Sequence, residues 1–154
     1  MEQYDYICYF DGACEPKNPG GNMGIGAIIT DREGTVLDKL SHFVKPSENN
    51  SNNVAEYQGF GWVLKRISQL LPVGSKVVVR GDSKLVICQM KGEWGMKKGM
   101  YIQYAVRAKQ LLEEIKKNIF ITLEWVPREE NGLADELSKG CMIANNVHFK
   151  IQPL

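Results

Sequence analysis

The 154-residue chain carries 24% charged residues and a formal net charge of +1. This length accommodates one domain without a second catalytic domain, and the near-neutral charge means that any nucleic-acid partner must be met by a local concentration of Lys and Arg. The sequence shows no apolar run near the roughly 18 residues of a membrane span, no signal or transit peptide, and no zinc motif among its four cysteines, so we expect a cytoplasmic protein with free thiols and no membrane partner.

The first half of the chain predicts three β-strands. Aromatic and β-branched residues, or alternating apolar residues, mark strands at 4–10, 24–30 and 36–44. Gly and Pro make residues 12–22 turn-prone, and the turn signals at 31–34 predict a hairpin between the second and third strands. We therefore expect an antiparallel meander.

The second half predicts helices separated by two further strands. Apolar residues at helical spacing, with a stop at Pro72, predict a first long helix over 52–71. The remaining elements, in chain order, are a strand at 76–79, a short helix at 83–90, a long helix at 100–117, a strand at 119–126 and a last helix at 132–142. This order predicts an α/β fold with a mixed five-stranded sheet, three antiparallel strands followed by parallel additions, and helices on both faces.

The domain is expected to span residues 1–144, with a C-terminal tail at 145–154. Apolar residues alternate in the tail, which permits an extended segment packed on the domain, although a mobile end explains the weak pattern equally well. The polar run at 45–53 is expected to be a loop.

Four acidic residues fall at the ends of predicted elements. Asp11 closes the first strand, Glu56 lies in the first turn of the first long helix, Asp82 ends the fourth strand and Asp135 opens the last helix. If the first and fourth strands are adjacent, Asp11 and Asp82 are neighbours, and helix ends can present the other two acids beside them. For Glu56 or Asp135 alone, a surface acid in a first helical turn is as good an explanation. Four acids together favour a shared site.

Such a cluster requires cations, because four carboxylates at one edge of a sheet cannot all stay ionised unaided. Mg²⁺ and Mn²⁺ prefer oxygen ligands and neutralise the repulsion. Two ions about 4 Å apart can activate a water and stabilise the leaving oxygen of a phosphodiester. We therefore expect a nuclease site that uses Mg²⁺, with Mn²⁺ as a substitute.

Four segments resemble, in order, the motifs of the type 1 ribonucleases H. FDGACEPKNPG at 10–20 is similar to the family's first-strand motif, SNNVAEY at 51–57 to its Asn-Asn-x-x-Glu motif and GDSKLV at 81–86 to its Asp-Ser motif. WVPREENGLADELS at 125–138 resembles the closing motif, with Asn131 and Asp135 at the family's spacing. The resemblance covers almost the whole predicted domain and implies the ribonuclease H-like fold.

The resemblance implies an endonuclease that hydrolyses the RNA strand of an RNA/DNA hybrid, and we expect a monomer. It implies two ions in the substrate complex, both bridged by Asp11. Glu56 and Asp82 would complete the protein ligands of one ion, and Asp135 would serve the ion that holds the attacking water. The products would carry 5′-phosphate and 3′-hydroxyl ends.

Several polar residues match family positions that contact the hybrid. They are Cys14, Asn18, Asn52 and Asn53, with Ser51 near a DNA phosphate site. Backbone groups and Asn side chains can read the 2′-hydroxyl across the shallow minor groove. Turn formation before Pro19 explains Asn18 at least as well, whereas helix capping explains only one of Asn52 and Asn53.

Basic residues concentrate between Lys84 and Lys117, where eight Lys and Arg stand against three acids and leave a local charge of +5. Phosphate contacts from such a patch would make binding salt-dependent. A solvated helix face explains Lys116 and Lys117. The candidates for contact are Lys84 and, in the loop at 91–99, Trp94, Lys97 and Lys98. Trp94 could stack on a sugar or base or be buried in the core. Trp62 and Trp125 are expected in the core.

Two features depart from the pattern of many family members. The segment between Asp82 and Trp125 is too short to contain a large basic protrusion, and no separate hybrid-binding domain is expected before the first strand, so affinity for hybrid should be modest. The loop before Asp135 is short and offers Arg128 where many relatives carry His. This pattern resembles the family's branch with a shortened loop.

Arg128 is expected to hold the scissile or departing phosphate, because its guanidinium stays protonated and is a poor proton shuttle. The alternative is a surface arginine paired with Glu129 or Glu130. Two other functions share this pattern of residues: another metal-dependent nuclease or strand-transfer protein of the same fold, and a hybrid-binding module without activity. Asn52 and Asn53 favour a protein that recognises RNA, and the four intact carboxylates favour an enzyme.

Overall fold

The computed structural model describes residues 3–151 and 153. Its elements follow in chain order: β1 (Tyr6–Glu15), β2 (Asn22–Asp31), β3 (Val36–Val44), α1 (Asn52–Leu70), β4 (Lys76–Gly81), α2 (Lys84–Met90), α3 (Ile102–Ile115), β5 (Phe120–Trp125), the short 3-10 turn η1 (Arg128–Glu130) and α4 (Gly132–Ala144). The sheet order is β3-β2-β1-β4-β5, antiparallel from β3 to β1 and parallel from β1 to β5. The predicted mixed five-stranded sheet is confirmed.

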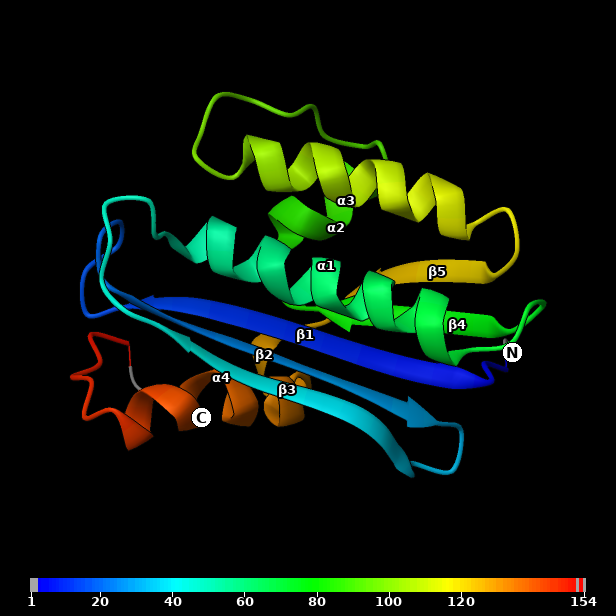
Figure 1. Ribbon diagram of the computed structural model, residues 1–154, viewed down its shortest axis with the longest axis horizontal. Helices are drawn as coiled ribbons and strands as arrows, with labels where there is room; N and C mark the ends of the chain where they lie inside the picture. The colour runs from blue at the N-terminus through cyan, green and yellow to red at the C-terminus, as the bar shows by residue number, and fades with distance from the viewer. Residues whose placement is uncertain (1–2, 152, 154) are drawn as a thin grey trace.

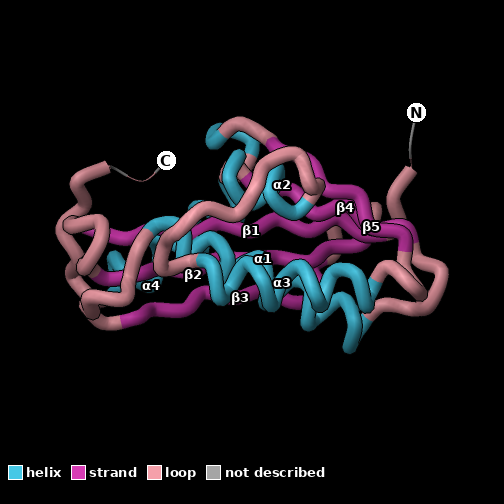
Figure 2. Tube along the Cα trace, turned by 90° about the horizontal axis from the view of Figure 1, so that it is seen from above, coloured by secondary structure: helices cyan, strands magenta, loops and turns pink. Residues whose placement is uncertain are grey.

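Helices cover both faces of the sheet, as predicted. α1, α2 and α3 lie on one face and α4 on the other (Figure 1), and the view from above shows α1 and α3 side by side along the sheet (Figure 2). Phe10 of β1 packs edge-on against Phe60 of α1, with ring centroids 5.3 Å apart, in the core between sheet and helices. Burying a side chain of this kind contributes about 1.5–3 kcal/mol, which holds α1 against the strand that carries Asp11. No helix in the described part of the chain is long and apolar enough to cross a bilayer.

The first strand is longer than predicted. The expectation that Asp11 closes it is wrong, because β1 continues to Glu15. Every residue of β1 pairs with β2, with Asp11 opposite Gly26, so Gly12, which was predicted to form a turn, joins the sheet. The parallel pairing of β1 with β4 does end at Phe10 and Gly81. Asp11 therefore still lies directly after the end of the parallel ladder.

Two glycines let helices approach the sheet closely. A Cβ at Gly12 of β1 would lie 2.4 Å from the carbonyl carbon of Ala55, and a Cβ at Gly26 of β2 would lie 2.4 Å from the carbonyl oxygen of Ala134. These distances leave no space for a side chain, so α1 and α4 can pack here only against glycine. Each contact directly precedes one of the four acidic residues along the chain. The two glycines therefore bring the helical carboxylates close to β1.

The C-terminal tail crosses the end of β1. The backbone N–H groups of Lys150 and Ile151 donate to Glu15 Oε1 at 2.6 and 3.3 Å. Glu15 is a buried acid at the last position of the strand. The described tail residues therefore contact the domain at the end of β1.

Candidate active site

Three acidic side chains converge where β1 and β4 stop pairing. Asp11 of β1, Glu56 of α1 and Asp82, which follows β4, each place one carboxylate oxygen within 4.8 Å of the others. Glu56 is 8% exposed, which excludes a surface acid, and it lies beyond the first turn of α1. The predicted position in that turn is wrong because the helix already begins at Asn52. The predicted neighbourhood of Asp11 and Asp82 is confirmed.

Asp135 lies on α4, on the opposite face of the sheet from α1 (Figure 1). It lies in the first turn of α4, as predicted, but is 2% exposed, so the surface alternative is wrong here too. Lys139 Nζ donates to Asp11 Oδ2 and to Asp135 Oδ1, each at 2.9 Å. Lys139 was not predicted as a site residue. Its spacing of four residues from Asp135, which places both on one helix face, was the available signal.

The site holds carboxylates whose ionisation is disfavoured. Burial, followed by the charges of Asp11 and Asp82, raises the pKa of Glu56 well above its ordinary value. Burial and then the charge of Asp11 raise the pKa of Asp82 to about 6. Burial opposes the charged form of Lys139, but the neighbouring Asp11 and Asp135 outweigh it and raise the lysine pKa. The lysine remains a cation and offsets part of the negative charge.

The three converging carboxylates fit a hard divalent cation. Their ligand oxygens are close enough to share one ion. Glu56 Oε1 is buried and has no hydrogen-bond partner among the described residues, so a ligand atom is available there. Mg²⁺ and Mn²⁺ prefer oxygen donors of this kind. Asp11, Glu56 and Asp82 are therefore residues that could hold a divalent cation.

A family model described as reverse transcriptase-like matches residues 9–141, a span that includes all four carboxylates. The chain belongs to this family. The N-terminal RNase H domain of Rv2228c from Mycobacterium tuberculosis, solved as a fusion with maltose-binding protein, is 30% identical with a TM-score of 0.79 and covers 94% of this chain and 97% of that chain. The mixed sheet described above is thus that of a type 1 ribonuclease H domain.

A second similar structure was solved with nucleic acid. LC11-RNase H1, in complex with an RNA/DNA hybrid, is 29% identical with a TM-score of 0.76, over 92% of this chain and 99% of that chain. The curated bifunctional protein Rv2228c of M. tuberculosis is 34% identical over 129 residues, which are 82% of this chain and 33% of that protein. The ribonuclease H domain described here therefore spans about a third of the length of that curated relative.

Three of the predicted hybrid-contact residues meet at the start of α1. Asn52 Oδ1 accepts from the backbone N–H of Cys14 at 2.9 Å, and the backbone N–H of Asn52 donates to Asn18 Oδ1 at 3.0 Å. Ser51 Oγ caps the helix by accepting from Val54 N, so neither Asn is needed for that cap. Asn52 and Asn53 are both exposed. In the ribonuclease H domain, the Asn18 side chain thus joins two segments in addition to any turn that it forms.

The predicted contact loop is exposed and anchored at its base. Trp94 is 48% exposed, so the alternative of core burial is wrong, and Lys97 and Lys98 are exposed beside it. Gln89 Nε2 donates to the backbone oxygen of Gly95 at 3.1 Å and ties the loop to α2. The exposed pair Lys117–Glu114 lies at the far end of α3, in agreement with a solvated helix face.

Trp125 was expected in the core, and that prediction is wrong. It ends the edge strand β5 and is 42% exposed, because an edge strand has a sheet neighbour on one side only. Its indole N–H donates to the backbone oxygen of Asp82 at 3.1 Å, and Lys84 Nζ lies 4.7 Å from its ring centroid. Trp125 therefore holds both the chain at Asp82 and the predicted contact residue Lys84. Trp62, by contrast, packs partly buried against the core.

Two residues of the closing loop touch the site. Arg128 Nη2 lies 3.5 Å from Asp135 Oδ1, so the arginine contacts a carboxylate of the site. Asn131 is 1% exposed, and its Nδ2 donates to the backbone oxygen of Phe10 at 2.9 Å. This bond joins the start of α4 to the strand residue before Asp11. The structural role of Asn131 could not be read from its spacing alone.

We predict that the metal-free ribonuclease H domain loses stability as the pH rises from about 4 through 6. Unfolded Glu56 and Asp82 release protons near their ordinary pKa values of 4.5 and 3.8, whereas the folded site keeps them to higher pH, to about 6 for Asp82. The folded state therefore binds more protons in this window, and raising the pH costs it stability. The Tm measured in chelator should fall across the window, and Mg²⁺ should reverse the fall.

The matched control is Asp82→Asn, which removes one of the titrating groups. Its Tm in chelator should fall less steeply over the same pH range. A wild-type Tm that rises with pH in chelator, or the same slope in both proteins, would contradict the assignment of raised carboxyl pKa values to this site.

Proposed function

We propose that this chain is an endonuclease that hydrolyses the RNA strand of RNA/DNA hybrids. The observation that carries the proposal is the convergence of Asp11, Glu56 and Asp82, with a buried and unpartnered Glu56 oxygen, in a chain of the reverse transcriptase-like family. The hybrid bound by LC11-RNase H1, a similar structure, supports this class of substrate. Residues 1–144 would form the catalytic unit and residues 145–154 its tail.

The four carboxylates would hold two Mg²⁺ ions in the substrate complex, and Mn²⁺ would substitute. Asp11 would contribute to both ions, with Glu56 and Asp82 at one and Asp135 at the other. When bound, such ions activate water and stabilise the leaving oxygen, which yields 5′-phosphate and 3′-hydroxyl ends. Ser138 Oγ, 2.8 Å from Asp11 Oδ2, and Asn131 orient the strand carboxylate and its backbone.

RNA would be recognised at the junction of β1 and α1. Cys14 near the end of β1, Asn18 from the loop after it, and Asn52 and Asn53 from α1 would present amide groups and backbone groups to one surface. Across a shallow minor groove, such groups can donate to and accept from the 2′-hydroxyl of RNA. DNA has no 2′-hydroxyl, so these contacts would distinguish the two strands. Ser51 would lie near a phosphate of the DNA strand. Arg128, beside Asp135, would hold the scissile or departing phosphate.

The test is cleavage of end-labelled RNA/DNA hybrid, double-stranded RNA and double-stranded DNA, each with Mg²⁺, Mn²⁺ or chelator. We expect cutting of the RNA in the hybrid with either ion and none with chelator. Cutting of double-stranded DNA instead would support the alternative of another nuclease or strand-transfer protein of this fold. Hybrid binding without cutting under any condition would identify a binding module.

We predict that the double variant Lys97→Ala/Lys98→Ala raises KM for hybrid more than it lowers kcat. Both side chains are exposed on the loop after α2, and phosphate contacts remote from the cut bind ground and transition states alike. The slope of log binding constant against log salt should fall by about one to two units.

The matched control is Lys116→Ala/Lys117→Ala, which removes the same charge from the far end of α3, where Lys117 already pairs with Glu114. Its salt slope should equal that of the wild type. Equal slopes for both double variants and the wild type would place the loop outside the interface.

A further inference from the structure

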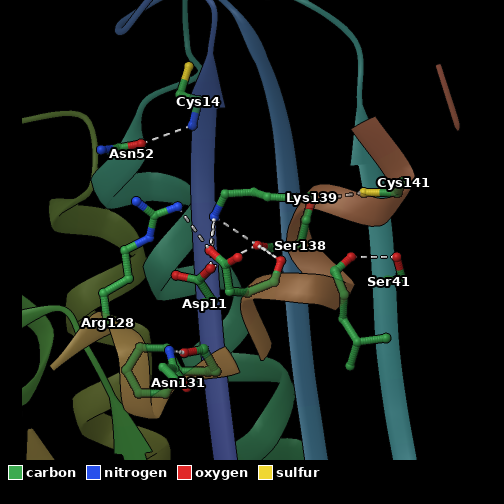
Figure 3. Close-up of polar contacts among 12 residues, drawn as sticks. Asp11, Cys14, Ser41, Asn52, Arg128, Asn131, Ser138, Lys139 and Cys141 are labelled. Atoms are coloured by element: carbon green, nitrogen blue, oxygen red, sulfur yellow. Dashed lines mark hydrogen bonds and ion pairs between the residues drawn. The ribbon is translucent and has the colours of Figure 1, made fainter. Parts of the chain in front are cut away.

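Lys139 lies inside the carboxylate site, although the proposed function gives it no part. Its Nζ donates to Asp11 Oδ2 at 2.9 Å, to Asp135 Oδ1 at 2.9 Å and to Ser138 Oγ at 3.1 Å (Figure 3). An ammonium group carries three hydrogens, so these three acceptors use all of its donors. The side chain is 8% exposed. Lys139 is therefore a fully satisfied internal cation.

The contacts of Lys139 divide the site into two positions. Asp11, Glu56 and Asp82 form one group of ligand oxygens, which Asp135 does not join within the part of the chain that the structure describes. The other position, between Asp11 and Asp135, is filled by the ammonium. A divalent cation shared by these two carboxylates would approach their oxygens to about 2.0–2.6 Å. The ammonium and that cation cannot occupy the position together.

The Lys139 side chain also borders a cavity into which it could move. A cavity of about 730 Å³ lies against α4, and its lining includes Lys139, Asp135, Gly140 and Ile143. Lysine carries a compact charge on a flexible four-carbon stem, so the ammonium can move toward a nearby anion while the helix stays in place. A phosphate of a bound nucleic acid would be such an anion. Lys139 can therefore leave the position between the carboxylates without refolding of α4.

We infer that Lys139 closes the position between Asp11 and Asp135 in the hybrid-free protein and so sets the order of cation binding. The inference rests on the proposed function, because it assumes that these carboxylates bind divalent cations. One cation binds at Asp11, Glu56 and Asp82 in the free protein. The second enters only after bound hybrid draws the ammonium away. Until then Lys139 supplies the positive charge that the second ion would otherwise provide.

Calorimetric titration of the hybrid-free protein with Mn²⁺ tests this order. Wild type should bind one Mn²⁺ per chain, and Lys139→Met, which removes the charge but keeps a side chain of similar length, should bind two. Lys139→Gln should also bind two, and it retains hydrogen-bond donors for Asp11 and Asp135 if the methionine variant fails to fold. Lys65→Met is the matched control, because Lys65 is exposed on α1 and its loss changes the net charge equally. It should bind one.

The outcomes separate this inference from the proposed function. Wild type that binds two Mn²⁺ without hybrid overturns the role of Lys139, whatever the variants do. One Mn²⁺ in wild type and in every folded Lys139 variant also overturns it, but leaves the cation site of the proposed function intact. Wild type that binds no Mn²⁺ overturns both. A gain of a second ion in the Lys139 variants and not in Lys65→Met supports the inference.

Discussion

Asp11→Asn is expected to lower kcat for hybrid cleavage by about a thousandfold or more, since it removes charge from the centre of the ligand group. Asp11 belongs to the three-carboxylate group and is also bonded to Lys139 and Ser138, so it is the carboxylate with contacts on both sides of the site. An amide keeps the shape of the side chain but is a neutral and weaker ligand for a hard cation. Binding of hybrid should survive, because the proposed nucleic-acid contacts lie elsewhere.

The same substitution should change stability little. Loss of the Asp11 charge relieves repulsion with Glu56 and Asp82 in the metal-free protein, but it also removes one partner of the buried Lys139. These effects oppose each other. Steady-state cleavage, hybrid binding and thermal unfolding should be measured together, with Asp38→Asn as control, since Asp38 pairs with Arg66 away from the site. Turnover near the wild-type rate in folded Asp11→Asn would rule out Asp11 as the shared ligand.

Arg128→Ala should lower kcat by about tenfold to a thousandfold. The guanidinium lies beside Asp135 and is 34% exposed, so it can face a phosphate while it contacts the site. Fixed, bidentate hydrogen bonds suit it to hold a phosphate, whereas permanent protonation makes it a poor proton shuttle. Arg128→Lys should recover only part of the activity, because an ammonium keeps the charge but lacks the planar pair of donors.

Single-turnover and steady-state rates distinguish the two roles open to Arg128. A loss seen in both points to help at the scissile phosphate, and a loss confined to steady state points to product departure. Arg32→Ala is the matched control, because Arg32 pairs with Asp5 outside the carboxylate site and its removal should leave both rates unchanged. Full activity of Arg128→Ala under both conditions would leave the carboxylates and their ions as the whole catalytic apparatus.

Local sequence pattern was sufficient for most elements of this fold. The helix predicted over 52–71 is found at Asn52–Leu70, because its apolar spacing and the following Pro72 are local signals. The strand beyond Asp11 was missed because Gly12 favours turns on its own. It joins a strand here because β2 pairs with it and α1 approaches too closely for any side chain. Tertiary packing, and not the local sequence, therefore places Gly12 in a strand.

Local sequence likewise predicts some residues of the site and not others. The four carboxylates could be predicted, because each falls near the end of a predicted element and within a segment that resembles a family motif. Lys139 could not, because a lysine four residues after an acid is most often part of an exposed ion pair. Its burial depends on how closely α4 packs over Gly26, which the pattern of α4 itself does not encode. The exposure of Trp125 likewise follows from the edge position of β5, which only the sheet order reveals.

The most direct test of the account is a duplex in which one strand is DNA with a central block of ribonucleotides and the other strand is DNA throughout. Both strands carry end labels, and Mg²⁺ or chelator is added. The account predicts Mg²⁺-dependent cuts only within the ribonucleotide block, with 5′-phosphate ends on the downstream products, because recognition of the 2′-hydroxyl and the carboxylate site must coincide. Cuts in the all-DNA strand or outside the block, or cutting that persists in chelator, would contradict it.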